Sequence, residues 1–299
     1  MTGGERFGCV EAGGTKFVCA VGSAPDRIEA ITRIDTTTPK ETLERALAFF
    51  RAEGLAPGKC AGFGVASFGP LILDRRAADW GRIGRTPKPG WSGTDMAGVF
   101  GRAFGAPVGF NTDVAAAALA EARWGAAQGA QLAIYLTVGT GIGGGVVANG
   151  RPFHGRAHAE MGHMIPARHP EDRDFPGVCP FHGACLEGLA SGPAILARWG
   201  ASLSDLPGDH PAHAIVGWYL GGHAANLMAA IAPDLIVIGG GVLATRGLID
   251  RIRIAAATAD AGYRADPPAW QRIIVAPGLG DRSGILGALA LAQDAARDG

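Results

Sequence analysis

The sequence has no excess of charge of either sign, because 27 lysine and arginine residues balance 27 aspartate and glutamate residues. A zero net charge argues against a protein built to coat nucleic acid or an anionic membrane surface, although it leaves room for a small local basic site. We therefore expect neither nucleic acid nor a membrane among the partners of this chain.

Cysteine and long apolar runs are also scarce. The 299 residues contain five cysteines, which are too few and too scattered for a disulfide framework. Residues 1–6 are polar, with no apolar signal core after them. We identify no uncharged apolar run of the ~18–20 residues that a membrane-spanning helix needs. These features predict a cytoplasmic protein.

What the sequence does have is glycine, at 48 of its 299 positions, against about 7% in an average protein. The glycines follow no Gly-X-Y period and the chain is rich in alanine and aliphatic residues, which excludes collagen and disorder. A length of 299 residues suggests two domains at ~100–200 residues each. We therefore expect the glycines in turns and ligand loops.

Two segments share the pattern of an apolar strand, a glycine turn and a second apolar strand, one in each half of the chain, at residues 7–22 and 132–148. This repetition predicts a duplicated α/β architecture. Residues 74–91 and 150–190 are expected to be irregular. Hydrophobic spacing predicts helices from residue 39 and over 114–124, 193–199, 211–231 and 283–296, and further strands over 28–36, 60–66, 107–110 and 234–241.

Three glycine clusters are candidate nucleotide loops. In the first two, backbone N–H groups without an obstructing Cβ lie beside a threonine hydroxyl and can surround a phosphate. The third follows a strand and is expected to open a helix, where anions bind favourably. Tight hairpins and close packing explain any single cluster equally well, but three in one chain favour a nucleotide. The clusters are Gly13, Gly14, Thr15 and Lys16; Thr137, Gly139, Thr140 and Gly141; and Gly239, Gly240 and Gly241.

Three common nucleotide-binding motifs do not account for these clusters. The sequence contains no G-x-x-x-x-G-K-[ST] and lacks the signature set of protein kinases. The stretch Gly139-x-Gly141-x-x-Gly144 matches the dinucleotide fingerprint, with Glu160 at about the right ~20-residue distance. That fingerprint requires a helix where a strand is expected here, so we reject a P-loop, a Rossmann site and a protein kinase.

Four motifs occur in the order of a known family: Glu-Ala-Gly-Gly-Thr-Lys at 11–16, Thr-Pro-Lys-Pro-Gly-Trp at 86–91, Ala-Glu-Met-Gly-His at 159–163 and Cys-Pro-Phe-His-Gly-Ala-Cys-Leu-Glu-Gly at 179–188. From about residue 7 to about residue 290 the chain resembles the ROK family of sugar kinases and repressors, specifically its bacterial fructokinase branch.

The resemblance implies a duplicated two-domain α/β fold, that of the actin-like ATPases (ribonuclease H-like), with a central cleft. We expect residues 1–112 together with 287–299 to form an N-terminal domain. Residues 113–286 are expected to form a C-terminal domain with an insertion near 150–190. The family resemblance also implies a homodimer.

Asp113 is the candidate catalytic base. Phosphoryl transfer to a hydroxyl requires a carboxylate within hydrogen-bond reach of that hydroxyl. Asp113 precedes an alanine-rich helical segment, where an N-cap is the structural alternative, and both roles can hold together. The family's base lies at the start of a helix, and the resemblance implies that Asp113 is this residue. The implied reaction is the ATP-dependent conversion of D-fructose to fructose 6-phosphate.

Magnesium is expected with ATP, because the charge of the phosphates must be bridged and neutralised. The resemblance places Glu11 near this ion, where many relatives have aspartate. Thr112 departs from the asparagine of the family's glucokinase branch, which favours a fructokinase. Glucokinase, mannokinase and N-acylhexosamine kinase activities remain alternatives. A sugar-responsive regulator is disfavoured, because the first strand begins at about Phe7 and leaves no room for a helix-turn-helix domain.

The spacing Cys179-x2-His182-x2-Cys185 suits tetrahedral zinc. A fourth ligand must come from elsewhere, and the sequence offers His154, His158, His163 and His169. Two unrelated thiols and a surface histidine are the alternative. The resemblance implies that His163 is the fourth ligand. Since four protein ligands leave no open position, the zinc is expected to be structural and to stabilise the irregular 150–190 region.

The resemblance also implies a hexose site. Glu160 and Glu187 resemble family positions that hydrogen-bond sugar hydroxyls, although solvated surface carboxylates are the commoner fate of glutamate. Both flank proposed zinc ligands, so the zinc would hold the sugar site in position. The other expected sugar-site residues are Ser67, Gly69, Asn111, Thr112, Asp113 and His163.

Overall fold

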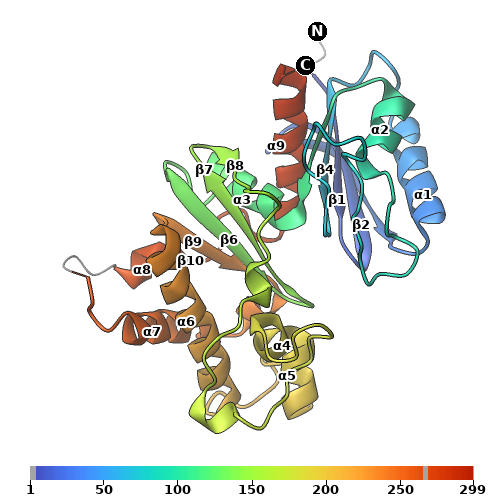
Figure 1. Cartoon of the computed structure of the whole chain (residues 1–299). Helices are drawn as coiled ribbons and strands as arrows, with labels where there is room; N and C mark the ends of the chain where they lie inside the picture. The colour runs from blue at the N-terminus through green and yellow to red at the C-terminus, as the bar shows by residue number, and fades with distance from the viewer. Residues whose placement is uncertain (1–4, 265–268, 299) are drawn as a thin grey trace.

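The computed structural model describes residues 5–264 and 269–298. It contains two five-stranded mixed sheets, one in each half of the chain (Figure 1). In the N-terminal sheet the order is β3-β2-β1-β4-β5, in which the first two pairs are antiparallel and the last two are parallel. Its strands are β1 (Phe7–Ala12), β2 (Lys16–Ala24), β3 (Arg27–Asp35), β4 (Gly62–Ser67) and β5 (Val108–Thr112).

The C-terminal sheet repeats this connectivity. Its order is β10-β9-β6-β7-β8, so β6 to β10 take the places of β1 to β5, with the same parallel and antiparallel pairs. The duplicated α/β architecture that the two hairpins predict is therefore confirmed. The strands are β6 (Leu132–Val138), β7 (Ile142–Ala148), β8 (Arg151–Pro152), β9 (Leu235–Gly239) and β10 (Ile274–Val275).

Helices cover both faces of each sheet. Helices α1 and α2 pack on one face of the N-terminal sheet and α9 on the other, while α3 packs on β6 and β7. The opposite face of the C-terminal sheet shares a core with α6 and α7. The helices are α1 (Pro39–Ala52), α2 (Met96–Phe104), α3 (Asp113–Trp124), α4 (Leu186–Ala190), α5 (Gly192–Trp199), α6 (Ala212–Ile231), α7 (Leu248–Asp260), α8 (Trp270–Ile273) and α9 (Ser283–Asp298), with 3-10 turns η1 (Met161–His163), η2 (Pro170–Asp172), η3 (Gly241–Ala244) and η4 (Gly280–Arg282).

Helices α3 and α9 pack against each other and form the layer between the two sheets (Figure 1). Both helices are rich in alanine, and their buried faces form one core with residues of both sheets. The approach to the N-terminal sheet is closest at β4, where a Cβ on Gly64 would lie 1.7 Å from the Ala288 carbonyl oxygen. Only glycine fits there, so some of the glycine excess serves this central layer.

The third glycine cluster does not open an α-helix, contrary to expectation. Gly240 has a φ of +93°, which lies outside the helical region. The chain after β9 therefore forms only the short 3-10 turn η3, and α7 begins later, at Leu248.

Helix α6 contradicts the expectation that no uncharged apolar run is long enough to span a bilayer. It has 20 residues, and its most apolar window has a mean hydropathy of 1.2. However, 61% of that window is buried inside the protein. A helix that is apolar on all sides is found either in the core of a large protein or in a membrane, and the burial of α6 is that of a core helix.

Candidate functional site

A cavity of about 560 Å³ lies where the two halves of the chain meet. Glu11 of β1 contributes the N-terminal side and Thr137 of β6 the C-terminal side, and Asp113 lies at the start of α3 in the layer between the sheets. The rest of the wall includes the glycine stretch Gly239–Gly241 after β9 and the first turn of α9. These residues lie at or after the carboxyl ends of parallel strands, where α/β proteins bind their ligands.

Asp113 is the first residue of α3 but does not cap the helix. The N-cap is Thr112, whose hydroxyl accepts a hydrogen bond from the Ala115 N–H at 3.1 Å. The N-cap alternative for Asp113 is therefore wrong, because the preceding residue already fills that role. One carboxylate oxygen of Asp113 accepts a hydrogen bond from the Val114 N–H at 2.9 Å, and the side chain borders the cavity. The carboxylate is thus held at the cavity wall by the helix terminus.

The cavity raises the pKa of both of its central carboxyl groups. Burial raises the pKa of Asp113 to about 6, with a smaller contribution from the negative charge of Glu160 and opposition from backbone hydrogen bonds. Burial also raises the pKa of Glu11 to about 7, and the charges of Asp113 and Asp281 add to this shift. Carboxyl groups with pKa values near neutrality in a cavity are typical of functional sites. Asp113 can therefore exchange a proton near physiological pH.

Glu11 is confined by the start of α9. A Cβ on Gly284 would lie 2.2 Å from Glu11 Oε1, so any other residue at position 284 would displace the carboxylate. The last helix of the chain therefore shapes the cavity wall contributed by the first strand.

The glycine turns at 13–16 and 139–141 do not line this cavity. We expected both turns to form one nucleotide site together with Gly239–Gly241. Residues 13–16 form an exposed turn between β1 and β2, held by a 2.9 Å hydrogen bond from the Gly13 N–H to the Lys16 carbonyl oxygen. Residues 139–141 form the turn between β6 and β7, where the Gly139 N–H donates to the Gly141 carbonyl oxygen at 2.9 Å. Among the expected nucleotide residues, Thr137 and Gly239–Gly241 line the cavity.

The expected sugar-site residues fall into a buried and an accessible group. Ser67, Asn111 and Thr112 are buried at the ends of β4 and β5, where Ser67 and Thr112 are register partners. Glu160 is exposed, whereas the Glu187 carboxylate accepts a hydrogen bond from the Ile142 N–H at 2.9 Å. Glu187 therefore already stabilises the turn between β6 and β7.

Comparison with known proteins decides the family. The sequence profile of the ROK family matches residues 7–295. The chain belongs to the ROK family. It is 49% identical over 289 residues to the fructokinase of Zymomonas mobilis, covering 96% of each chain. The resemblance drawn from the four motifs is confirmed.

Solved ROK structures have the same fold as this chain. The ROK hexokinase from Thermus thermophilus superimposes with a TM-score of 0.76 at 29% identity, covering 98% of this chain and 100% of that one. The ROK glucokinase from Streptomyces griseus, in complex with glucose and AMPPNP, has a TM-score of 0.74 at 26% identity, covering 97% and 99%. The expected actin-like ATPase fold is confirmed by these neighbours.

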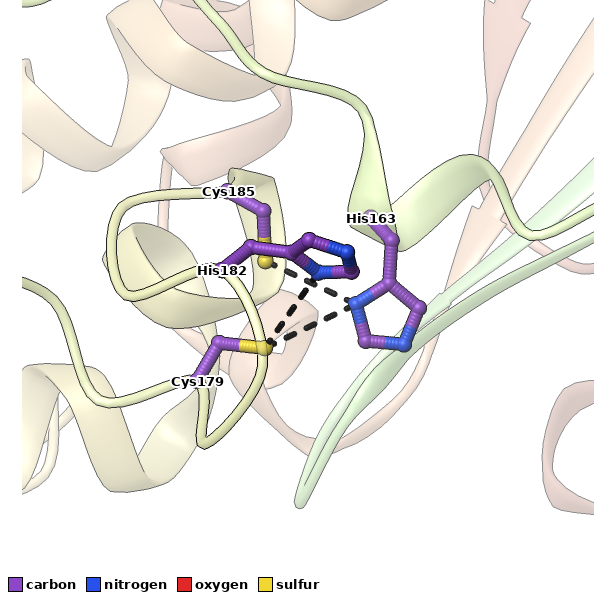
Figure 2. A group of neighbouring side chains, drawn as sticks. All are labelled: His163, Cys179, His182 and Cys185. Atoms are coloured by element: carbon purple, nitrogen blue, oxygen red, sulfur yellow. Dashed lines mark hydrogen bonds between the residues drawn. The ribbon is translucent and has the colours of Figure 1, made fainter. Parts of the chain in front are cut away.

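The fold also brings together two cysteines and two histidines, namely His163, Cys179, His182 and Cys185 (Figure 2). Their four ligand atoms all lie within 4.8 Å of one another, with 3.7 Å from Cys179 Sγ to the Nδ1 atoms of His163 and His182, and 3.6 Å from Cys185 Sγ to His163 Nδ1. A tetrahedron with zinc–ligand bonds of ~2.0–2.3 Å has edges of about 3.3–3.8 Å, so these three separations fit.

The choice of His163 over the other histidines is consistent with this geometry. His154, His158 and His169 lie outside the cluster within the part of the chain that the structure describes. The His163 Nδ1 atom points to the two sulfur atoms, so the opposite side of its ring faces away from them (Figure 2).

Several residues of the cavity wall were not expected from the sequence. Tyr135, Asp281, Ser283 and Gly284 all line the cavity. The sequence held a signal for the last three, because the stretch 278–284, which runs into the closing helix, contains three glycines. Burial raises the pKa of Tyr135 to about 12, which keeps this hydroxyl neutral.

Proposed function

We propose that this protein transfers the γ-phosphoryl group of ATP to D-fructose and forms fructose 6-phosphate. The relative with 49% identity over 96% of the chain is a fructokinase, and two solved neighbours are a ROK hexokinase and a ROK glucokinase bound to AMPPNP. The observation that carries the proposal is Asp113, a carboxylate on the wall of the cavity between the halves with a pKa of about 6.

Asp113 is proposed as the catalytic base. Its carboxylate would accept the proton of the attacking hexose hydroxyl as the oxygen bonds to the γ-phosphorus. A pKa of about 6 leaves the group ionised at neutral pH and brings it near the pH at which a base acts efficiently. Attachment to the first turn of α3 fixes the carboxylate in direction, which limits the loss of entropy during the reaction.

The nucleotide is proposed to occupy the cavity, with its phosphates toward Asp113. Gly239–Gly241 and Thr137 form the wall that can approach a phosphate. We assign the two exposed turns at 13–16 and 139–141 to the phosphates as well, which requires the halves to close around the ligand. The nucleotide residues are thus Gly13, Gly14, Thr15, Lys16, Thr137, Gly139, Thr140, Gly141, Gly239, Gly240 and Gly241.

Glu11 is the proposed neighbour of Mg²⁺. Its carboxylate borders the cavity and offers the oxygen ligands that this ion prefers. When bound, the ion supplies charge neutralisation for the phosphates. Its positive charge would favour the ionised form of Glu11, whose pKa burial otherwise raises to about 7.

We infer that the cluster of His163, Cys179, His182 and Cys185 holds a structural zinc ion. The two thiols and two imidazoles are ligands that zinc prefers, and their separations fit a tetrahedral site. The four side chains come from η1 and from the loop before α4, so the ion would connect two irregular segments. Glu160 directly precedes η1, and Glu187 lies in the first turn of α4.

The hexose is proposed to bind between the ends of β4 and β5 and the segment 158–163. Asp113, Asn111 and Thr112 would contact it from one side, with Ser67 and Gly69. Glu160, Glu187 and the outward nitrogen of His163 would contact it from the other. Support comes from Glu160, whose charge acts on the pKa of Asp113 and which therefore lies near the proposed base.

The proposed domains are residues 1–112 with 287–299, and residues 113–286. Helix α3 follows the N-terminal strands in sequence but packs on β6 and β7, which supports its place in the C-terminal domain. Helix α9 ends the chain but packs on β1 and β4, which supports its place in the N-terminal domain. We also propose a cytoplasmic homodimer, by analogy within the family.

An ADP-release assay over several sugars tests the proposed function. Purified protein with MgATP is expected to turn over fructose with a higher kcat/KM than mannose, glucose or N-acetylmannosamine. Preference for another of these sugars would replace fructokinase by glucokinase, mannokinase or N-acylhexosamine kinase activity. No turnover of any sugar would leave a sugar-responsive regulator as the remaining family function.

A further inference from the structure

A single hydrogen bond connects the loop after β4 with the segment before η1. His158 Nε2 accepts it from the Leu71 N–H at 3.0 Å, although the two residues are 87 positions apart. The imidazole also lies against Gly69, where a Cβ would be 3.4 Å from His158 Cε1. Because β4 belongs to the N-terminal sheet and η1 packs on β7 of the C-terminal sheet, this bond joins the two halves of the protein.

The other ring nitrogen faces a proposed sugar ligand. His158 Nδ1 lies 3.4 Å from Glu160 Oε1 and 3.4 Å from the Ala159 carbonyl oxygen. A backbone N–H can only donate, so Nε2 must be unprotonated, and the neutral ring carries its proton on Nδ1. The Nδ1 proton therefore lies between two acceptors at the same distance, the Ala159 carbonyl oxygen and the Glu160 carboxylate, while the acceptor nitrogen holds Leu71.

Glu160 has few other restraints on its side chain. Its side chain is 54% exposed, whereas that of His158 is only 9% exposed. Within the described residues, His158 is the one side chain that interacts with the Glu160 carboxylate. A long exposed side chain with one partner loses its preferred position when that partner is removed.

We propose that His158 is a positioning residue of the hexose site. Its neutral imidazole holds the 69–71 loop against the C-terminal half and at the same time orients Glu160 toward the space beside Asp113. This inference rests on the proposed function, because it requires the hexose to bind next to Glu160. It assigns His158 no contact with ATP and no proton transfer to the substrate.

Steady-state kinetics of three variants test the role. His158→Ala is expected to raise KM for fructose about tenfold, with KM for ATP unchanged, because the buried Leu71 N–H and the carboxylate both lose their partner. His158→Gln should recover most of this loss, since its amide oxygen can accept from Leu71 and its NH₂ group can donate to Glu160. His154→Ala, at a partly buried histidine nearby, is the matched control and should leave both KM values unchanged.

Equal changes in both KM values, or an unchanged KM for fructose in His158→Ala, would overturn the positioning role. Hydrogen exchange of the Leu71 amide in the ligand-free protein gives a readout that does not depend on activity. We expect protection to fall at least about tenfold in His158→Ala and to persist in His158→Gln. Unchanged protection in His158→Ala would refute the bond between the halves.

The two readouts separate this inference from the proposed function. If the wild-type protein prefers another hexose, the same KM comparison is made with that sugar. If it phosphorylates none, the proposed function fails and with it the assignment of His158 to a hexose site. The exchange result then decides only whether His158 connects the two halves.

Discussion

The Ser283 hydroxyl donates a 2.6 Å hydrogen bond to Glu121 Oε1, across 162 positions of sequence. This bond joins α3 to the first residue of α9 in the layer between the two sheets. Glu121 is fully buried, and its carboxylate also accepts hydrogen bonds from three backbone N–H groups, those of Ala126, Gly278 and Leu279. One carboxylate therefore fixes the loop that forms part of the cavity wall.

Replacing Glu121 by alanine is expected to destabilise the fold strongly. The change leaves three backbone N–H groups and the buried Ser283 hydroxyl without their acceptor, at a cost of at least ~3 kcal/mol in the free energy of unfolding. Ser283→Ala removes only one of these bonds and should cost about 1–2 kcal/mol. Urea denaturation of both variants measures the difference. Equal stability losses would show that the Glu121 carboxylate does not act as a shared acceptor.

Asp113→Asn should abolish most turnover while leaving the protein folded. The amide keeps the size of the side chain but cannot accept the proton of the hexose hydroxyl, so kcat is expected to fall by about 10²–10⁴. Circular dichroism checks the fold, and an ADP-release assay measures kcat. A variant that retains more than a tenth of the wild-type kcat would exclude Asp113 as the base.

The raised pKa of Asp113 predicts an acid limb in the pH profile of the enzyme. Below pH about 6 the carboxylate is protonated and kcat/KM should fall tenfold per pH unit. The free energy of unfolding changes in the opposite direction to the activity, so it falls as the pH rises. A carboxyl group whose pKa is raised by folding destabilises the folded state, and this destabilisation is complete above the folded-state pKa. Asp113→Asn should therefore be more stable than wild type at pH 7.5 by up to about 3 kcal/mol, because the shift is about two pKa units at ~1.4 kcal/mol each.

This stability difference should shrink as the pH falls from 6 toward the unfolded value of 3.8. Thermal denaturation of both proteins across this range measures it. A constant difference, or a kcat/KM that is flat from pH 5 to pH 7, would show that Asp113 does not titrate near 6.

Gly284→Ala tests the contact between α9 and Glu11. The new Cβ would stand 2.2 Å from Glu11 Oε1 and must displace the carboxylate. We expect KM for MgATP to rise about tenfold with the fold intact. Gly222→Ala is a matched control, because it lies in α6 with no heavy atom within 4 Å of the added Cβ. A KM equal to that of the control would remove Glu11 from the nucleotide site.

Metal analysis decides the proposed zinc site. Purified protein is expected to contain about one zinc per chain, and Cys185→Ser should lose the metal together with roughly 3 kcal/mol of stability. Cys60→Ser is the matched control, since Cys60 is also buried but lies outside the cluster and donates only to the Gly62 carbonyl oxygen. Wild-type protein with normal activity and no stoichiometric zinc would contradict the proposal.

Most of the fold follows from local sequence patterns. Pro39 predicts the start of α1, which begins at that residue, and the structure adds the Thr38 side chain as its N-cap. The two apolar hairpins predict the two sheets, because alternation and turn residues are local properties of the chain. The cysteine and histidine spacing is equally local, and the structure brings those side chains together.

The sequence by itself determined the family, the duplicated architecture and the residues that can carry the chemistry. Only the tertiary structure decided that the 278–284 segment lines the cavity beside Asp113, and that Glu121 holds this segment. These outcomes depend on desolvation and on contacts between segments more than 100 positions apart, as in the bond between Glu121 and Gly278. Such contacts form only when the halves pack together, so the three glycines of 278–284 mark this segment in the sequence but do not reveal its partner.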